Sequence, residues 1–79
     1  MAISVEALQQ RVQQAFPGDS VNATGDGYHF QLTVVSEQFD GLRTVQRQQK
    51  VYAIVNDWIA NGELHALTMK TLTPSEAAS

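Results

Sequence analysis

Apolar residues recur every three or four positions along the first segment of the chain. The apolar positions in this segment are Val5, Leu8, Val12 and Phe16. That spacing follows one face of an α-helix, and glutamines fill most of the opposite face. Ser4 has the side chain of a helix N-cap, and Pro17-Gly18-Asp19 stops the helix and turns the chain. We therefore predict an amphipathic helix over residues 4–16.

The hydrophobic period changes to two after residue 20. Apolar and polar side chains alternate from Val21 to Ala23 and again from Phe30 to Val34, and a Gly-Asp-Gly sequence separates the two runs. Glycines at positions 25 and 27 can adopt the positive φ values of a tight connection. The pattern predicts two strands joined as an antiparallel hairpin. A phosphate-binding loop is not favoured, because neither a helix start nor Gly-Lys-Ser/Thr follows these glycines.

A connection and a second helix are predicted next. Residues 36–42 contain one apolar anchor, Phe39, and a turn at Asp40-Gly41. A wide apolar stripe then runs to Asn61-Gly62, which has the residues of a left-handed C-cap. Its members are Val45, Val51, Tyr52, Ile54, Val55, Trp58 and Ile59. The polar run 46–50 interrupts this stripe, so we expect the helix to begin with a separate turn.

The last apolar segment has the length and the threonine content of a strand. Residues 64–72 would place His65, Leu67, Met69 and Thr71 on one face. Thr73-Pro74-Ser75-Glu76 then has the form of a capping box with proline at the first helical position, which predicts a short C-terminal helical turn. The order helix, strand, strand, helix, strand predicts an α+β fold, with a three-stranded sheet and helices packed on one face.

Length and composition limit this fold to one small domain. The 79 residues can build one modest core, so we predict a single domain over residues 1–79. Cysteine is absent, which excludes disulfides, thiolate ligands and a cysteine nucleophile from this sequence. We find no signal-peptide pattern and no stretch that could span a membrane, and we expect a cytoplasmic protein without membrane partners.

The charged residues favour binding over catalysis. The titratable residues form no obvious nucleophile–base pair and no His-Glu-x-x-His element, so the sequence offers no case for an enzyme. A net charge of −3 argues against general binding to nucleic-acid backbones. Arg43, Arg47 and Lys50 nevertheless lie within eight residues that contain no acid, and could face phosphates or an acidic protein surface. Composition alone favours a solvated helix face for them.

Two histidines are the candidate metal ligands. His29 lies just after the Gly-Asp-Gly turn, and His65 lies at the start of the third predicted strand. A neutral imidazole can bind a borderline metal ion, and two of them could supply half of a tetrahedral site. Spacing alone favours an ordinary polar role for both, because single histidines at strand ends are common. Tyr52 and Trp58 fall on the apolar stripe, and we interpret them as core residues rather than base-stacking platforms.

Several short motifs together resemble the BolA family. They are Phe39-Asp40-Gly41, Val45-Gln46-Arg47, Lys50-Val51-Tyr52, Leu64-His65-Ala66-Leu67 and Thr71-Leu72-Thr73-Pro74, with a Gly-Asp-Gly-x-His-Phe hairpin similar to that of one bacterial branch. Their order and spacing cover nearly the whole chain. The resemblance implies a fold like that of a type II KH domain, in agreement with the element order above. It does not imply RNA binding of the KH type, because the Gly-x-x-Gly backbone clamp is missing.

The resemblance also implies a shared iron–sulfur cluster. BolA-like proteins pair with a monothiol glutaredoxin and bridge a 2Fe-2S cluster, for which the glutaredoxin cysteine and glutathione supply thiolates. The BolA partner supplies nitrogen ligands, and His65 matches the C-terminal ligand histidine of the family. The second ligand lies in the hairpin loop, where Asp26 aligns and His29 follows three residues later, so the choice stays open between His29, Asp26 and none. The isolated chain is expected to bind no cluster.

DNA binding is a second implication of the resemblance. Some BolA proteins are described as stress-response transcriptional regulators that bind promoters through the helix and strand region, where Arg43, Arg47 and Lys50 would contact phosphates. Gln48 and Gln49 replace His and Arg of other members, which makes the cationic footprint small. A third hypothesis is an interaction adaptor without metal. Alone, the chain is expected to be a monomer or a weak homodimer.

Overall fold

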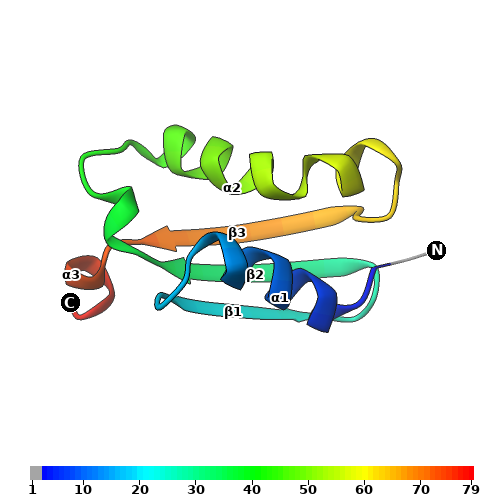
Figure 1. Cartoon of the computed structure of the whole chain (residues 1–79), viewed down its shortest axis with the longest axis horizontal. Helices are drawn as coiled ribbons and strands as arrows, with labels where there is room; N and C mark the ends of the chain where they lie inside the picture. The colour runs from blue at the N-terminus through cyan, green and yellow to red at the C-terminus, as the bar shows by residue number, and fades with distance from the viewer. Residues whose placement is uncertain (1–2) are drawn as a thin grey trace.

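The computed structural model describes residues 3–79 and packs helices on one small sheet (Figure 1). Within this range the elements are α1 (Val5–Ala15), β1 (Ser20–Gly25), β2 (His29–Val35), the 3-10 helix η1 (Glu37–Phe39), α2 (Thr44–Ala60), β3 (Ala66–Leu72) and α3 (Pro74–Ala77). The predicted element order is confirmed, and α3 is the expected C-terminal helical turn. None of the helices within residues 3–79 combines the length and the apolar character of a membrane-spanning segment.

The three strands form one sheet in the order β1-β2-β3. β1 runs antiparallel to β2, as the hairpin pattern predicts, and β3 runs parallel to β2. A parallel neighbour requires a crossover connection, which α2 supplies between β2 and β3. In Figure 1, α1 crosses in front of β1 and β2, and α2 runs beside β3. The starts of β2 and β3 therefore lie at the same end of the sheet.

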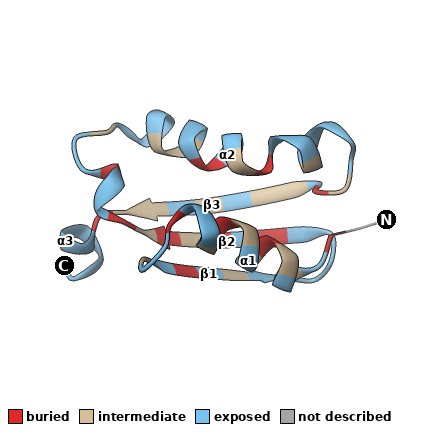
Figure 2. Cartoon of the chain, in the orientation of Figure 1, coloured by how far each residue is buried: buried red, intermediate tan, exposed pale blue. Residues whose placement is uncertain are grey.

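The core lies between one face of this sheet and the two long helices. Along β2, Phe30, Leu32 and Val34 are buried and alternate with exposed His29 and Gln31. This alternation is the period-two pattern of a strand with one covered face. The buried turns of α2 lie on its side next to the sheet in Figure 2. The opposite face of the sheet carries mainly polar side chains.

Phe39 anchors the connection between β2 and α2, as predicted. Its side chain is fully buried, and its ring centroid lies 5.4 Å from that of Phe16. Phe16 is the C-cap residue of α1, so this contact joins the end of the first helix to η1. The turn that follows η1 uses Gly41 at a φ of +79°, a conformation that glycine adopts without strain.

The hairpin turn uses its two glycines for different reasons. Gly27 has a φ of +96°, as expected, but Gly25 does not have a positive φ. A Cβ at Gly25 would instead meet the His29 carbonyl oxygen at 2.6 Å and a Phe30 ring carbon at 2.9 Å. The prediction of a positive φ at Gly25 was therefore wrong. Glycine is needed there because the two strands approach each other too closely for a side chain.

Helix α2 is continuous from its first residue, which corrects the expected separate first turn. Glutamines and lysine are good helix formers, so the polar run continues the helix with its side chains largely toward solvent. The Gln46 side chain accepts a hydrogen bond from the Arg43 backbone N–H at 2.9 Å and satisfies a donor at the helix start. The helix ends as predicted, with Gly62 at a φ of +80°.

The aromatic residues of α2 are less buried than their stripe predicts. Tyr52 is 38% exposed, so its interpretation as a core residue was wrong. Trp58 packs against the core but is only partly buried, and the Arg11 guanidinium carbon lies 3.5 Å from its ring centroid. Arg11 also pairs with Asp57 at 2.7 Å, so one side chain of α1 holds two residues of α2.

The outer edge of β1 is covered by a side chain of α1. The Ala23 backbone N–H donates to Gln9 Oε1 at 2.7 Å, and the Gln9 amide nitrogen donates to the Val21 carbonyl. The carboxamide thus pairs with the strand much as another backbone would. Covering an edge in this way protects it from pairing with other chains.

Candidate functional site

The parallel pairing of β2 and β3 brings the two histidines to one end of the sheet. His29 is the first residue of β2 and is in register with Ala66, the first residue of β3. His65 immediately precedes Ala66, so it lies in the loop before β3 rather than inside the strand as predicted. Both histidines are exposed. We call the group formed by Asp26, Tyr28, His29 and His65 the histidine cluster.

Asp26 organises the hairpin turn of this cluster. Its Oδ1 accepts hydrogen bonds from the backbone N–H groups of Tyr28 at 2.9 Å and His29 at 2.8 Å. The Asp26 N–H donates in turn to the His29 carbonyl at 3.1 Å. The hydrogen bonds donated by the backbone N–H groups of His29 and Tyr28 favour the charged carboxylate and lower the pKa of Asp26. This carboxylate is therefore a fixed acceptor within the turn.

His29 lies beside the second oxygen of the same carboxylate. Its Nδ1 is 3.6 Å from Asp26 Oδ2, and both side chains are mostly exposed. A carboxylate next to one imidazole nitrogen orients the ring and leaves the other nitrogen, Nε2, to meet a ligand. The geometry thus separates the roles of the two residues: Asp26 Oδ1 is committed to the turn, and the His29 imidazole is exposed beside the same carboxylate.

His65 is set in place by the residues on either side of it. Leu64 is buried, and its N–H donates to the Trp58 carbonyl at 3.0 Å, which fixes the end of the loop against α2. On the other side, the Ala66 N–H donates to the Tyr28 carbonyl at 3.4 Å. The His65 ring stacks on the Tyr28 ring, with centroids 4.9 Å apart and planes inclined by 20°.

Tyr28 is the member of the cluster that sequence reasoning missed. Its ring also meets the His29 ring edge-on, at 4.9 Å between centroids and 78° between planes. The only signal in the sequence was a large aromatic residue in a turn otherwise made of small and polar residues. Its contacts depend on the β2–β3 pairing, which the sequence pattern alone does not reveal.

The donor set fits a cluster shared with another molecule. Two exposed imidazoles are suitable ligands for iron, and a 2Fe-2S cluster needs four ligands in total. This sequence has no cysteine, so thiolates would have to come from a partner. Among residues 3–79, no group of three or more histidine, aspartate or glutamate side chains is arranged to hold a metal ion.

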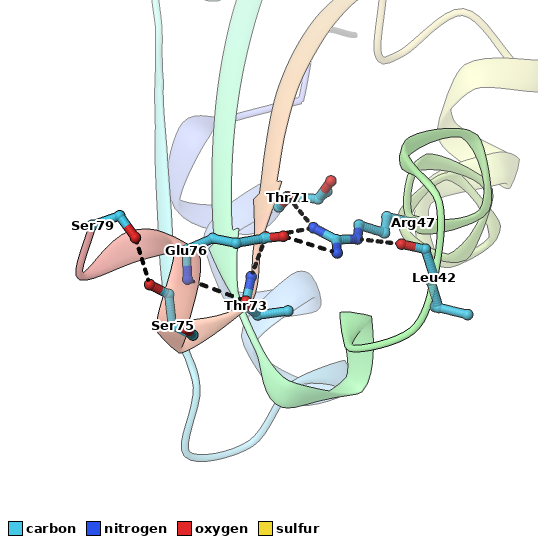
Figure 3. Close-up of polar contacts among 7 residues, drawn as sticks. All are labelled: Leu42, Arg47, Thr71, Thr73, Ser75, Glu76 and Ser79. Atoms are coloured by element: carbon cyan, nitrogen blue, oxygen red, sulfur yellow. Dashed lines mark hydrogen bonds and ion pairs between the residues drawn. The ribbon is translucent and has the colours of Figure 1, made fainter.

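Arg47 has contacts that the sequence analysis did not anticipate (Figure 3). Its guanidinium pairs with both carboxylate oxygens of Glu76, at 2.7 and 3.2 Å. It also donates to the carbonyls of Leu42 at 3.0 Å and Thr71 at 3.1 Å. With 12% of its side chain exposed, Arg47 is committed to its own chain. The geometry therefore does not support the predicted phosphate contact of Arg47.

The other two residues of the basic stretch remain at the surface. Both are exposed: Arg43 is the residue before α2, and Lys50 lies in the N-terminal half of α2. Their charges could still meet an acidic surface or phosphates. Arg47 lies between them in the sequence but adds no free charge, because it is paired with Glu76. The cationic surface is smaller than the sequence suggests.

Comparison with known proteins identifies the relatives of this chain. A family model described as BolA-like protein matches residues 2–76. "Acid stress protein IbaG" of Escherichia coli is 39% identical over 71 residues, covering 90% of this chain and 84% of that protein. "DNA-binding transcriptional regulator BolA" of Haemophilus influenzae is 38% identical over 52 residues, covering 66% of this chain and 50% of the regulator. The structure of a BolA homologue from Coxiella burnetii has a TM-score of 0.84 at 28% identity, covering 98% of this chain and 99% of that one.

Proposed function

The chain belongs to the BolA-like family, and from this membership we propose that it is a non-enzymatic adaptor that binds a monothiol glutaredoxin and co-ligates a bridging 2Fe-2S cluster. Its task would be iron–sulfur trafficking or sensing of iron and redox state. The observation that carries this proposal is the histidine cluster, in which two exposed imidazoles, one at the start of β2 and one in the loop before β3, contact one tyrosine ring.

The ligands on this chain would be His65 and His29. Both are exposed at one end of the sheet, and the His29 Nδ1 lies 3.6 Å from Asp26 Oδ2. Asp26 is the weaker candidate, because its Oδ1 holds the turn through two backbone hydrogen bonds and because imidazole suits iron better than a carboxylate does. We therefore choose His29 over Asp26 as the second ligand. Glutaredoxin and glutathione would supply the thiolates.

Imidazole ligands would change the reduction potential and the acid sensitivity of the shared cluster. Replacing thiolate by histidine on one iron raises the reduction potential of a 2Fe-2S cluster, as in Rieske centres. Protons compete with the metal for the imidazole nitrogen, so the bond between histidine and iron is sensitive to acid. These properties suit a sensor or an adaptor that releases its cargo.

Binding measurements with and without the cluster test this proposal. If the chain co-ligates the cluster, calorimetric titration should give tighter binding to cluster-loaded monothiol glutaredoxin than to the apo form. Equal affinity for the two forms would instead identify a plain interaction adaptor. Gln31, an exposed residue two positions along β2 from His29, provides a control when replaced by alanine.

DNA-binding transcriptional regulation is the second candidate function. It is favoured by the name of the Haemophilus influenzae relative and by the exposure of Arg43 and Lys50. Such binding should weaken with salt at a log–log slope of about −0.9 per phosphate contact. Replacing Arg43 and Lys50 by alanine should reduce that slope, and no binding near physiological salt would exclude this function.

A further inference from the structure

The backbone of Tyr28 is fixed between two structural elements. Its N–H donates to Asp26 Oδ1 at 2.9 Å within the hairpin turn. Its carbonyl accepts from the Ala66 N–H at 3.4 Å, at the start of β3. Tyr28 thus connects the turn to the first residue of β3, directly after His65. Because its backbone is held at both ends, the Cα of Tyr28 has a defined position relative to both histidines.

The ring of Tyr28 gains little from burial in the core. It is 56% exposed, and it is not among the residues that pack against the hydrophobic core. Its aromatic contacts are with the two imidazoles, one stacked and one edge-on. Offset stacking and edge-to-face contact are the two favourable arrangements of aromatic rings. The tyrosine ring is therefore placed to act on the histidines rather than on the core.

We propose that Tyr28 is a positioning residue that holds the imidazoles of His65 and His29 in the geometry needed for shared metal ligation. This inference rests on the proposed function and adds to it a residue that does not itself bind metal. Exposed histidine side chains rotate about two side-chain bonds, and that freedom is lost when they bind a ligand. Stacking on a ring whose backbone is anchored removes part of this freedom before the partner arrives.

The tyrosine hydroxyl is not required for this role. Both contacts are made by the ring, so Tyr28→Phe should preserve them, whereas Tyr28→Ser should remove them. From the usual strength of an aromatic pair, we expect Tyr28→Ser to weaken binding of cluster-loaded glutaredoxin by about two- to tenfold. Tyr28→Phe should bind like the wild type.

NMR spectroscopy of the chain without cluster tests the positioning directly. A ring stacked on Tyr28 experiences its ring current, so the carbon-bound imidazole protons of His65 should be shifted from free-histidine positions in wild type and in Tyr28→Phe. In Tyr28→Ser these shifts should collapse toward those of free histidine. Core amide shifts, compared among the three proteins, show that the fold is retained. Imidazole shifts that are the same in Tyr28→Ser and wild type would overturn the inference.

Binding of cluster-loaded glutaredoxin separates this inference from the proposed function. If Tyr28→Ser binds like wild type while His65→Ala loses binding, the positioning role is overturned and the proposed function stands. If His65→Ala also binds like wild type, the proposed function fails, and the positioning role fails with it. Reduced binding by Tyr28→Ser together with rescue by Tyr28→Phe supports the inference.

Discussion

Arg47 and Glu76 form an ion pair that ties the start of α2 to the C-terminal helix α3. The Arg47 Nη1 lies 2.7 Å from Glu76 Oε1, and the same nitrogen donates to the Thr71 carbonyl at the end of β3. Glu76 is also the capping-box residue of α3, where its side chain accepts from the Thr73 N–H at 2.9 Å. One guanidinium thus holds a helix of four residues against the sheet.

Removing this ion pair should loosen the C-terminal segment. We expect Arg47→Met to lower the thermal unfolding midpoint, because Glu76 loses its charged partner and two backbone carbonyls lose a donor. Hydrogen exchange should rise in α3 and at the end of β3. Arg43→Met is the matched control, since Arg43 is exposed, and it should leave both measurements near the wild-type values. Equal effects of the two substitutions would contradict the structural role of Arg47.

The same ion pair predicts a loss of stability in acid. Hydrogen bonding to Arg47 lowers the pKa of Glu76 from its ordinary value of 4.5 to about 2 in the folded chain. A folded-state pKa below the unfolded one stabilises the fold above pH 4.5, and this contribution is lost as the pH falls toward 2. Urea unfolding at several pH values should show this loss in wild type and a smaller one in Glu76→Gln. Parallel pH curves for the two proteins would contradict it.

Gly25 should be sensitive to a single added methyl group. Gly25→Ala places a Cβ within 2.6 Å of the His29 carbonyl oxygen, so the strands must move apart. Overpacking of this kind costs about 1–3 kcal/mol, and the shift should also disturb His29. The free energy of unfolding and the His29 amide chemical shift measure the two effects. Thr24→Ala, at an exposed neighbour, is the control; an unchanged Gly25→Ala protein would contradict the close approach.

Two substitutions of Asp26 distinguish a turn residue from a metal ligand. Asp26→Asn keeps an oxygen that can accept the two backbone hydrogen bonds, whereas Asp26→Ala removes it. We expect Asp26→Ala to weaken binding of cluster-loaded glutaredoxin more than Asp26→Asn, because the turn that presents His29 loosens. If both substitutions equally abolish the spectral change that the chain causes in cluster-loaded glutaredoxin, Asp26 acts as a ligand instead.

Local patterns predicted most of this fold because each element carries its own signal. Ser4 caps α1, Gly62 ends α2, and Thr73 begins α3, each through short-range chemistry that the sequence displays. The continuous start of α2 was missed because polar residues interrupt an apolar stripe without interrupting a helix. The exposure of Tyr52 was missed because the stripe is wider than the surface that the sheet covers.

The sequence predicted the two histidines of the candidate site but not their contacts, because these contacts join distant segments. His65 and His29 could be named as candidates, but their common neighbour Tyr28 follows from the parallel pairing of β2 with β3. The pairing of Arg47 with Glu76 joins residues 29 positions apart and changes a presumed surface charge into a structural one. Long-range pairing of this kind has no signature in hydrophobic periodicity.

Spectroscopic titration of the histidine variants tests the central claim most directly. Wild-type chain, His65→Ala, His29→Ala and the exposed control Gln31→Ala would each be added to cluster-loaded monothiol glutaredoxin, and visible absorption and circular dichroism would be recorded. We predict a spectral change with wild type and Gln31→Ala, none with His65→Ala, and a weakened change with His29→Ala. A spectrum that wild type leaves unchanged, or that His65→Ala changes as wild type does, would contradict a shared cluster ligated by His65.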